Sequence, residues 1–267
     1  MTRIAIVGGA GRMGQTLARG LGALDDMEVV ALVDPHEPAE LGGARYEASI
    51  EGLGAHDVDV VVDVSVAASV VRSARWCAEH GVALVVGTTG LSEDDRAELA
   101  AAGERTGVVV AANFAIGAVL AERFAAWAAP YFERAEVIEM HHDAKVDAPS
   151  GTALTTAKRI GRAKVASGGA FEPDPTRKFV VEGARGASVD GVGIHSLRIR
   201  GAIAHQEVVM GTMGQSLTIR HDSYDRSSFM PGVIIAIRGI ASVTGLNIGV
   251  DDLIEGMFNS MSTDRAR

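Results

Sequence analysis

The sequence predicts an α/β protein, with an N-terminal Rossmann-like domain built on a parallel sheet and a second α+β domain with a mixed sheet. Three observations support this prediction. Short apolar runs alternate with helical patterns over the first 114 residues, a glycine-rich loop directly follows the first run, and the alternation stops after Phe114. A chain of 267 residues is long enough for two domains.

The first domain is predicted from the alternation of strand and helix patterns. We expect strands at 4–7, 29–33, 58–62, 83–86 and 108–111, and helices at 13–24, 67–79 and 93–105. The run at 58–62 is rich in valine, which favours a strand buried on both faces. Strands that alternate with helices form a parallel sheet with right-handed crossovers.

The second domain is predicted from a change of pattern after Phe114. We expect a helix at 115–127, a strand at 136–140, a helix from Ser150, a loop at 166–175, and strands with glycine turns over 192–221, such as the turn at 210–214. Helices at 228–244 and 250–257 then return to the first domain. The predicted domains are therefore 1–114 with 227–267, and 115–226.

Composition and charge exclude several classes of protein. A chain with 47% hydrophobic and 22% charged residues is globular rather than disordered or fibrous. Its net charge of −9 gives no attraction to nucleic acid or to an anionic membrane, so we expect neither partner. No apolar run approaches the ~18 residues of a membrane span, and residues 1–7 do not resemble a signal peptide.

The single cysteine, Cys77, excludes an intrachain disulfide and favours a reducing compartment, so we expect a cytoplasmic protein. Cys77 lies in a helical pattern. We interpret it as an inert packed thiol rather than as a nucleophile.

The glycine loop is the first candidate site. Gly8, Gly11 and Gly14 have the spacing G-x-x-G-x-x-G between a strand and a helix, and Asp34 follows Gly14 by 20 residues at the end of the second strand. This context is typical of dinucleotide binding, with the pyrophosphate at the helix N-terminus and the carboxylate on the ribose. The alternative is a purely structural turn. The predicted cofactor contacts are Gly8, Gly9, Ala10, Gly11, Arg12, Met13 and Asp34.

Two later segments lie where further cofactor contacts belong. One follows the strand at 83–86 and the other follows the strand at 108–111. Ligands of open α/β sheets bind at the carboxyl ends of the strands, although either segment could be only a polar turn. The residues predicted here are Gly87, Thr88, Thr89, Ala111, Ala112, Asn113 and Phe114.

A basic cluster in an acidic chain is the most informative stretch. Residues 139–153 read Glu-Met-His-His-Asp-Ala-Lys-Val-Asp-Ala-Pro-Ser-Gly-Thr-Ala. Consecutive strand residues point to opposite faces, so His141 and His142 share a pocket only where the strand ends or bends. Ser150 suits a helix N-cap, and N–H groups free at such a helix start favour a carboxylate-sized anion. A polar strand end with Ser150 as a cap is the structural alternative, and a metal site is disfavoured because adjacent histidines diverge.

In these residues and motifs, the chain resembles the 4-hydroxy-tetrahydrodipicolinate (dihydrodipicolinate) reductase family of the diaminopimelate and lysine pathway. The stretch 139–153 resembles the family signature. Gly8 to Gly14, the Gly-Thr-Thr-Gly at 87–90 and the Ala-Asn-Phe at 112–114 have the family's order and spacing. Similarity continues through 183–186 and 205–207 to 220–222 and covers nearly the whole chain. Two positions depart from the family: Val64, where an aromatic residue is usual, and Pro35, where some members carry a basic residue.

The resemblance implies an oxidoreductase that uses NADH or NADPH to reduce a cyclic dicarboxylate. Hydride adds to a conjugated carbon of the dehydrated ring, and the resulting enamine must then receive a proton. By motif position, His141 is the general acid with Lys145 as its companion, and His142, Gly151 and Thr152 hold the substrate carboxylates. The second domain is then a substrate-binding and oligomerisation domain, and the family implies a homotetramer built through its sheet.

Other functions remain open on the residues alone. A dinucleotide-binding redox sensor would need the glycine loop but not His141 or Lys145. A dehydrogenase of another amino or aldehyde acid is a further possibility, but aldehyde chemistry calls for a reactive cysteine. For the cofactor we expect NADH to be preferred, because Asp34 would repel a 2′-phosphate, while Arg12 could offset that repulsion.

Overall fold

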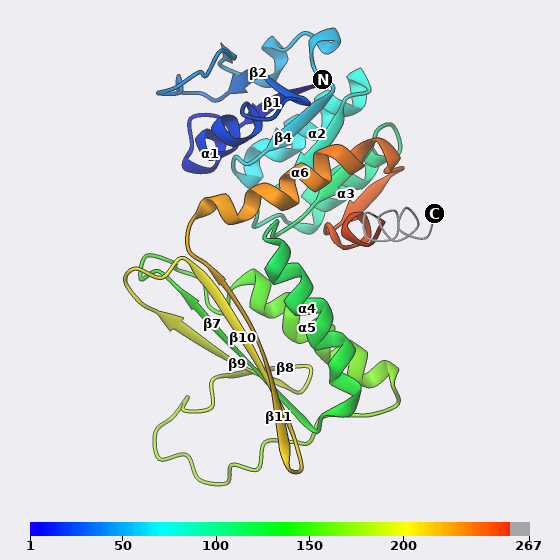
Figure 1. The fold of residues 1–267 in the computed structure, drawn as a ribbon. Coiled ribbons are helices and arrows are strands. Elements are labelled where there is room, and N and C mark those ends of the chain that lie inside the picture. The colour runs from blue at the N-terminus through cyan, green and yellow to red at the C-terminus, as the bar shows by residue number, and fades with distance from the viewer. Residues whose placement is uncertain (257–267) are drawn as a thin grey trace. The chain divides into compact units, whose positions relative to one another are not determined.

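The computed structural model describes residues 1–256, and it divides into two compact units (Figure 1). Unit 1 comprises Met1–Phe114 together with the segment that begins at Arg226, and unit 2 is Ala115–Asp225. The last residue of the helix predicted at 250–257 and the end of the domain predicted to reach residue 267 lie outside the described residues. Residues 251–256 are helical.

Unit 1 is built on one parallel sheet. Its strands are β1 (Thr2–Val7), β2 (Met27–Val33), β3 (Arg45–Glu47), β4 (Val60–Asp63), β5 (Ala83–Val86), β6 (Val108–Val110) and β12 (Leu246–Ile248). Its helices are α1 (Arg12–Leu21), α2 (Ala67–His80), α3 (Glu93–Gly103) and α6 (Met230–Gly239). The strand order is β12-β6-β5-β4-β1-β2-β3, and every pair is parallel. The predicted Rossmann-like sheet is therefore confirmed.

The order of this sheet decides where loops can meet. Strand β1 pairs with β2 on one side and with β4 on the other, so the strand order reverses there. Because all strands are parallel, their carboxyl ends meet at one edge, where ligands of open α/β sheets bind. The burial predicted for the run 58–62 is confirmed for Val60, Val61 and Val62, which are at most 3% exposed, but Asp59 is exposed and the strand begins only after it.

Cys77 lies in α2 and is fully buried in the core of unit 1. Burial raises the pKa of its thiol, because the thiolate would lose its hydration. The prediction of a packed thiol is confirmed, and Cys77 takes no part in the sites described below.

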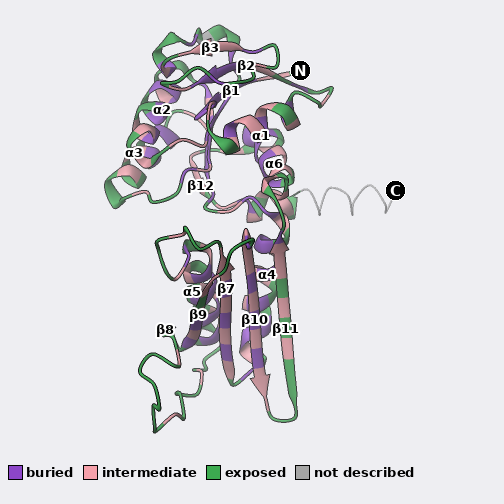
Figure 2. Ribbon diagram, turned by 90° about the vertical axis from the view of Figure 1, so that its left-hand side faces the viewer, coloured by how far each residue is buried: buried purple, intermediate pink, exposed green. Residues whose placement is uncertain are grey.

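Unit 2 is built on a mixed sheet, as predicted. Its strands are β7 (Arg134–His141), β8 (Ala187–Val189), β9 (Val192–Arg198), β10 (Ala204–Thr212) and β11 (Gln215–Ser223), and its helices are α4 (Ile116–Ala128) and α5 (Gly151–Ala166). The order is β11-β10-β7-β9-β8, in which β7 and β9 are parallel and the other pairs antiparallel. Buried and part-exposed residues alternate along β10 (Figure 2), and α4 and α5 contribute to the core on the buried face.

Several predicted boundaries are wrong for identifiable reasons. The helix predicted at 13–24 ends at Leu21, because glycine has a low helix propensity and occurs at both Gly20 and Gly22. The helix predicted at 228–244 is shorter, since α6 is followed by a 3₁₀ turn at Ile240–Ser242 and by β12. The turn predicted at 210–214 is confined to Met213 and Gly214, where Gly214 supplies a φ of +80°.

Three short strands were not predicted. They are β3, β8 and β12, each of three residues and each with a single strand neighbour in its sheet. The loop predicted at 166–175 is longer than expected, because the helix ends at Ala166 and no strand begins until Ala187. No helix within residues 1–256 is long and apolar enough to cross a membrane.

Candidate functional site

The glycine loop of unit 1 is shaped by two close approaches. Gly8 has a φ of +86°, and the N–H groups of Gly8 and Gly9 both donate to the Val33 carbonyl, at 2.9 and 3.1 Å. A Cβ on Gly14 would overlap the Gly8 carbonyl oxygen. The first and third glycines of the motif therefore allow α1 to pack directly on the loop.

The start of α1 offers unpaired donors. Gly11 is its N-cap without a side-chain cap, and its first turn holds no acidic residue. Within the described residues, the N–H groups of Arg12 and Met13 have no hydrogen-bond partner. These N–H groups and the positive end of the helix dipole together favour an anion such as a phosphate.

Asp34 is brought next to this loop, as predicted from its spacing. Its Oδ2 atom accepts a hydrogen bond from Ala10 N at 3.1 Å, and its Oδ1 atom accepts one from His36 N at 3.0 Å. Each carboxylate oxygen can accept a further bond. Asp34 thus supports the loop and keeps capacity for a hydroxyl donor.

A buried carboxylate that sequence reasoning missed organises the neighbouring loops. Asp63 ends β4, is fully buried, and accepts hydrogen bonds from the hydroxyls of Ser65 (2.6 Å), Ser73 (2.6 Å) and Thr88 (2.9 Å). Thr88 belongs to the predicted cofactor segment, but it is buried and its hydroxyl is engaged with Asp63. The hydroxyl proton of Thr88 is therefore already used within unit 1.

The other predicted cofactor residues lie at the ends of β5 and β6. A Cβ on Gly87 would lie 3.1 Å from a methyl carbon of Val64 and 3.2 Å from the Phe114 ring, so these three positions form one wall. Ala111 N donates to the Val86 carbonyl at 3.0 Å. The exposed positions in these segments are Thr89 and Ala112, whereas Asn113 is partly buried and Phe114 is buried.

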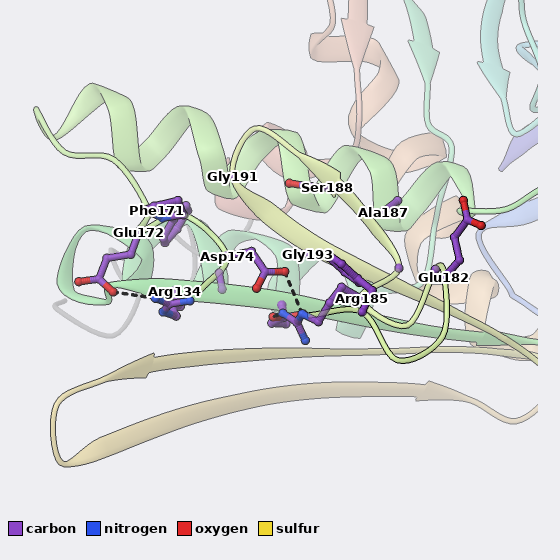
Figure 3. A pocket seen from close by; sticks show the side chains of 16 residues that line it. Arg134, Phe171, Glu172, Asp174, Glu182, Arg185, Ala187, Ser188, Gly191 and Gly193 are labelled. Atoms are coloured by element: carbon purple, nitrogen blue, oxygen red, sulfur yellow. Dashed lines mark hydrogen bonds and ion pairs between the residues drawn. The ribbon is translucent and has the colours of Figure 1, made fainter. Parts of the chain in front are cut away.

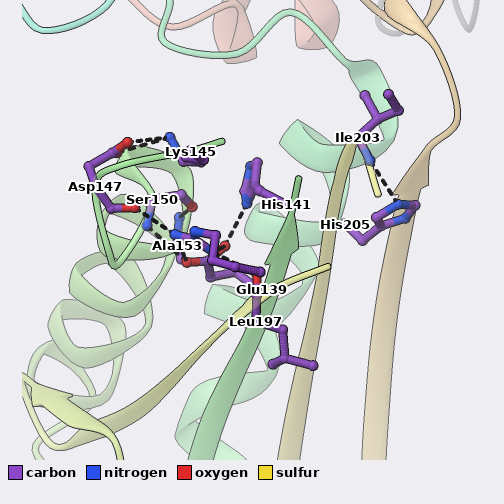
Figure 4. Close-up of polar contacts among 10 residues, drawn as sticks. Glu139, His141, Lys145, Asp147, Ser150, Ala153, Leu197, Ile203 and His205 are labelled. Carbon is purple, nitrogen blue, oxygen red and sulfur yellow. Dashed lines mark hydrogen bonds and ion pairs between the residues drawn. The ribbon is translucent and has the colours of Figure 1, made fainter. Parts of the chain in front are cut away.

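The site of unit 2 forms where β7 ends and α5 begins (Figure 4). Strand β7 ends at His141, and Ser150 is the N-cap of α5, with its Oγ accepting from Ala153 N at 3.2 Å. The predicted cap is confirmed. Within residues 1–256, the N–H groups of Gly151 and Thr152 have no partner, so they remain available to an anion.

Glu139 joins these two elements. It is two residues before His141 on β7, so both side chains lie on the same face of the strand. Its Oε2 lies 2.5 Å from His141 Nδ1, and its Oε1 accepts from Ser150 N at 3.2 Å. Arg198 of β9 donates to both carboxylate oxygens, at 2.9 and 3.0 Å.

Lys145 and His142 follow β7. The Nζ atom of Lys145 donates to both oxygens of Asp147, at 2.8 and 2.9 Å. Its N–H donates to the His142 carbonyl at 3.1 Å, which closes the turn after the strand. The His142 side chain is exposed and makes no hydrogen bond within the described residues, so His142 does not join the His141–Glu139 pair.

The protonation of the pair follows from its surroundings. Burial lowers the pKa of His141, and the nearby charges of Lys145 and Arg198 lower it further, although the bond to Glu139 opposes them. Burial would raise the pKa of Glu139, but hydrogen bonds from Arg198, Ser196 and His141 outweigh burial and hold it below its ordinary value. The carboxylate is therefore ionised near neutral pH.

A cavity of about 590 Å³ lies elsewhere in unit 2, under the long loop after α5 (Figure 3). Five of its charged side chains pair with one another: Arg185 with Glu136 and Asp174, and Arg134 with Glu172. It contains none of the predicted site residues. Within residues 1–256, no group of three or more His, Cys, Asp or Glu side chains is placed to hold a metal ion.

Glu139 and Arg198 were not among the predicted site residues, and they differ in whether the sequence carries a signal for them. Glu139 has a local signal, because the two-residue period of a strand places it beside His141. Arg198 has none, because it lies 59 residues from Glu139 and meets it only through the register that pairs His141 with Arg198 across β7 and β9.

Comparison with known proteins assigns both units to one family. Residues 2–114 match the family profile described as dihydrodipicolinate reductase, N-terminus, and residues 117–254 match dihydrodipicolinate reductase, C-terminus. The chain is 43% identical to the 4-hydroxy-tetrahydrodipicolinate reductase of Streptomyces coelicolor, over 95% of this chain and 98% of the relative. It is 45% identical to the same enzyme of Cutibacterium acnes, over 95% and 99%.

Comparison with solved structures finds a member of the same family and a more distant protein of the same fold. The dipicolinate-bound dihydrodipicolinate reductase from Paenisporosarcina sp. TG-14 matches with a TM-score of 0.83 and 39% identity, covering 94% of this chain and 99% of that one. A probable dehydrogenase from Thermotoga maritima matches with a TM-score of 0.64 at 14% identity, over 94% and 92%, which shows a shared fold alone.

Folding stability should depend on the ionised Glu139. Because its folded-state pKa is depressed, its contribution to stability is complete above the unfolded-state pKa of about 4.3 and is lost as the pH falls through the folded-state pKa. We expect the free energy of unfolding in urea to fall between about pH 5 and pH 3. Glu139→Gln, which has no carboxylate to protonate, should show a smaller fall, and equal falls in the two proteins would contradict this role.

Proposed function

Because the chain belongs to the dihydrodipicolinate reductase family, we propose that it reduces 4-hydroxy-tetrahydrodipicolinate to tetrahydrodipicolinate with NAD(P)H, in diaminopimelate and lysine biosynthesis. The observation that carries the proposal is the cluster at 139–153, which combines a partly buried histidine, a lysine and two unpaired N–H groups at a helix start. A redox sensor would not need this cluster.

The glycine loop of unit 1 fits a dinucleotide. Its unpaired N–H groups at Arg12 and Met13 suit the pyrophosphate, and Asp34 suits the adenosine ribose. The bound cofactor supplies the hydride. The remaining proposed contacts are Gly8, Gly9, Ala10, Gly11, Gly87, Thr88, Thr89, Ala111, Ala112, Asn113 and Phe114, which makes unit 1 the dinucleotide-binding domain.

The start of α5 fits a carboxylate of the substrate. The N–H groups of Gly151 and Thr152 would donate to it, with His142 as a further contact, and this makes unit 2 the substrate-binding domain. The Paenisporosarcina relative is described with dipicolinate, a planar ring dicarboxylate, bound. Lys145 supplies a positive charge nearby and would exchange Asp147 for the substrate.

His141 would supply the proton. Its Nδ1 atom faces Glu139, so its Nε2 atom is left to face the substrate. A bound dianion raises the pKa of a nearby imidazole, which opposes the lowering by burial. After hydride addition to the conjugated ring, the Nε2–H bond breaks and its proton adds to the enamine carbon, leaving His141 neutral to be protonated again from solvent.

The proposal is tested by coupled synthesis of the unstable substrate. The purified protein is mixed with NADH, and dihydrodipicolinate synthase, pyruvate and aspartate semialdehyde are added. Loss of NADH absorbance that requires all three additions supports the proposal. NADH binding without turnover would favour a redox sensor, and turnover of another amino or aldehyde acid alone would favour a different dehydrogenase.

Gly11→Val should abolish NADH binding without unfolding the protein. A Cβ on Gly11 would lie 3.2 Å from the Gly8 carbonyl oxygen, so that oxygen must shift by a few tenths of an ångström, whereas the Gly11 φ of −70° is ordinary for any residue. The larger side chain would block the close approach of a phosphate to the loop. Fluorescence titration measures this, with thermal unfolding to show that the variant is folded. Unchanged affinity in a folded variant would place the dinucleotide elsewhere.

His141→Ala and Lys145→Ala should each lower kcat by about 10²-fold or more, while the affinity for NADH stays nearly intact. The reason is that general acid catalysis typically contributes about 10²- to 10⁴-fold to the rate. Lys158→Ala is the matched control for Lys145, since it removes one exposed positive charge from α5 of the same unit. Near-normal kcat in both site variants at saturating substrate would refute the assignment.

NADH should be preferred over NADPH by roughly 3- to 30-fold in kcat/KM, or about 0.6–2 kcal/mol. Asp34 lies against the loop and would repel a 2′-phosphate, and no lysine or arginine occurs at 35–38. Arg12 is exposed and acts in the opposite direction. Kinetics with both cofactors at physiological salt measure the ratio. NADPH equal to or better than NADH would show that Arg12 dominates.

Unit 2 should also serve oligomerisation, through the sheet face that α4 and α5 leave open. Ile138, Met140 and Leu197 lie on that face and are only partly buried. Burial of this face against other copies would remove apolar surface from water. We expect a homotetramer of about 111 kDa in sedimentation, four times 27.7 kDa. A stable monomer would contradict it.

A further inference from the structure

Glu139 joins β7, β9 and the start of α5 beside the proposed substrate site, although it lies in the core. Its side chain is 1% exposed. One carboxylate oxygen faces His141 Nδ1 at 2.5 Å, the other accepts from Ser150 N at the start of α5, and Arg198 bridges both oxygens. A buried carboxylate is thus shared between the proposed proton donor and the proposed anion site.

The first consequence concerns the tautomer of His141. An ionised carboxylate can only accept hydrogen bonds, so the proton of the neutral imidazole must lie on Nδ1. The Nε2 atom then carries the lone pair and has no hydrogen-bond partner within residues 1–256. Glu139 therefore decides which ring nitrogen is left to take up and deliver the catalytic proton.

The second consequence concerns charge. The charged groups that act on His141 are Glu139 on its own strand, Lys145 in the following turn and Arg198 on β9. The two cations disfavour the imidazolium, and Glu139 favours it. At the same time, the two bonds from Arg198 neutralise Glu139, so that its charge does not repel an anion at Gly151 and Thr152.

We propose that Glu139 is the positioning residue of the substrate site, setting the tautomer and orientation of His141 and aligning it with the N-terminus of α5. This inference rests on the proposed function. Glu139 itself does not touch the substrate and acts through His141 and the start of α5.

The test compares Glu139→Gln with Glu136→Gln. Glutamine has one oxygen and one NH₂ group. Because Ser150 N and Arg198 Nη2 can only donate, the glutamine oxygen should face them, which turns the NH₂ group toward His141 and makes Nδ1 an acceptor. The same orientation removes the bond that Arg198 Nη1 donates to Glu139. Glu136 is the matched control, since it lies on the opposite face of β7 and also accepts from an arginine and a histidine, Arg185 and His195.

In Glu139→Gln we expect kcat to fall by about 10²-fold. The high-pH decline of kcat should move to lower pH by about one unit, because His141 loses the charge that favours its protonated form. Affinity for the probe dipicolinate should change less. In a His141→Ala background the same substitution should cause little further loss of kcat. Glu136→Gln should retain the wild-type kcat and pH profile, with its oligomeric state checked by light scattering.

A measurement on the wild-type protein keeps the inference testable if the variant does not fold. The ¹⁵N chemical shifts of His141, assigned from the signals that vanish in His141→Ala, should report Nδ1 as the protonated nitrogen of the neutral ring. Protonation on Nε2, or a Glu139→Gln variant with an unchanged kcat and pH profile, would overturn the role of Glu139. Absence of turnover by the wild-type protein would instead refute the proposed function.

Discussion

A carboxylate removed from water must be surrounded by hydrogen-bond donors, and both units are organised around that requirement. Asp63 in unit 1 and Glu139 in unit 2 are both fully buried near the carboxyl end of a strand. Asp63 collects hydroxyls from the segment after β4, from α2 and from the loop after β5, while Glu139 collects donors from β7, β9 and the start of α5. In each unit the segments proposed to bind ligand are therefore held by a group that does not itself face the ligand.

The two carboxylates have different kinds of hydrogen-bond donors, and within the described residues only one of them has its charge balanced by a cation. The side-chain donors to Asp63 are neutral hydroxyls of serine and threonine, which hold two loop segments and α2 against the carboxylate. Glu139 is met by the planar fork of an arginine as well as by a histidine, so its charge is balanced inside the core. A substrate with two negative charges calls for such balance, because an uncompensated carboxylate beside it would raise the free energy of binding.

Local patterns were sufficient to predict the parts of the fold and site that depend on near neighbours in sequence. The glycine spacing before α1, the Ser150 cap and the valine strand β4 are of this kind. The strands β3, β8 and β12 are too short for a periodic signal and exist because a neighbouring strand offers them hydrogen bonds. Arg198 likewise reaches Glu139 only through strand register, and no local pattern encodes a register between segments so far apart.

The chain leaves unit 1 after Phe114 and returns to it at Arg226, and this discontinuity has a consequence for biosynthesis. Strand β6 can pair with β12 only after all of unit 2 has been synthesised, because β12 lies at Leu246–Ile248. At about 5–20 residues per second, the edge of β6 waits on the order of 10 s for its partner. During that interval a nascent sheet of valine-rich strands has an open edge, the kind of surface on which strands of other chains can add. The insertion that gives the protein a second domain thus also sets a period in which the sheet of the first one has an unpaired edge.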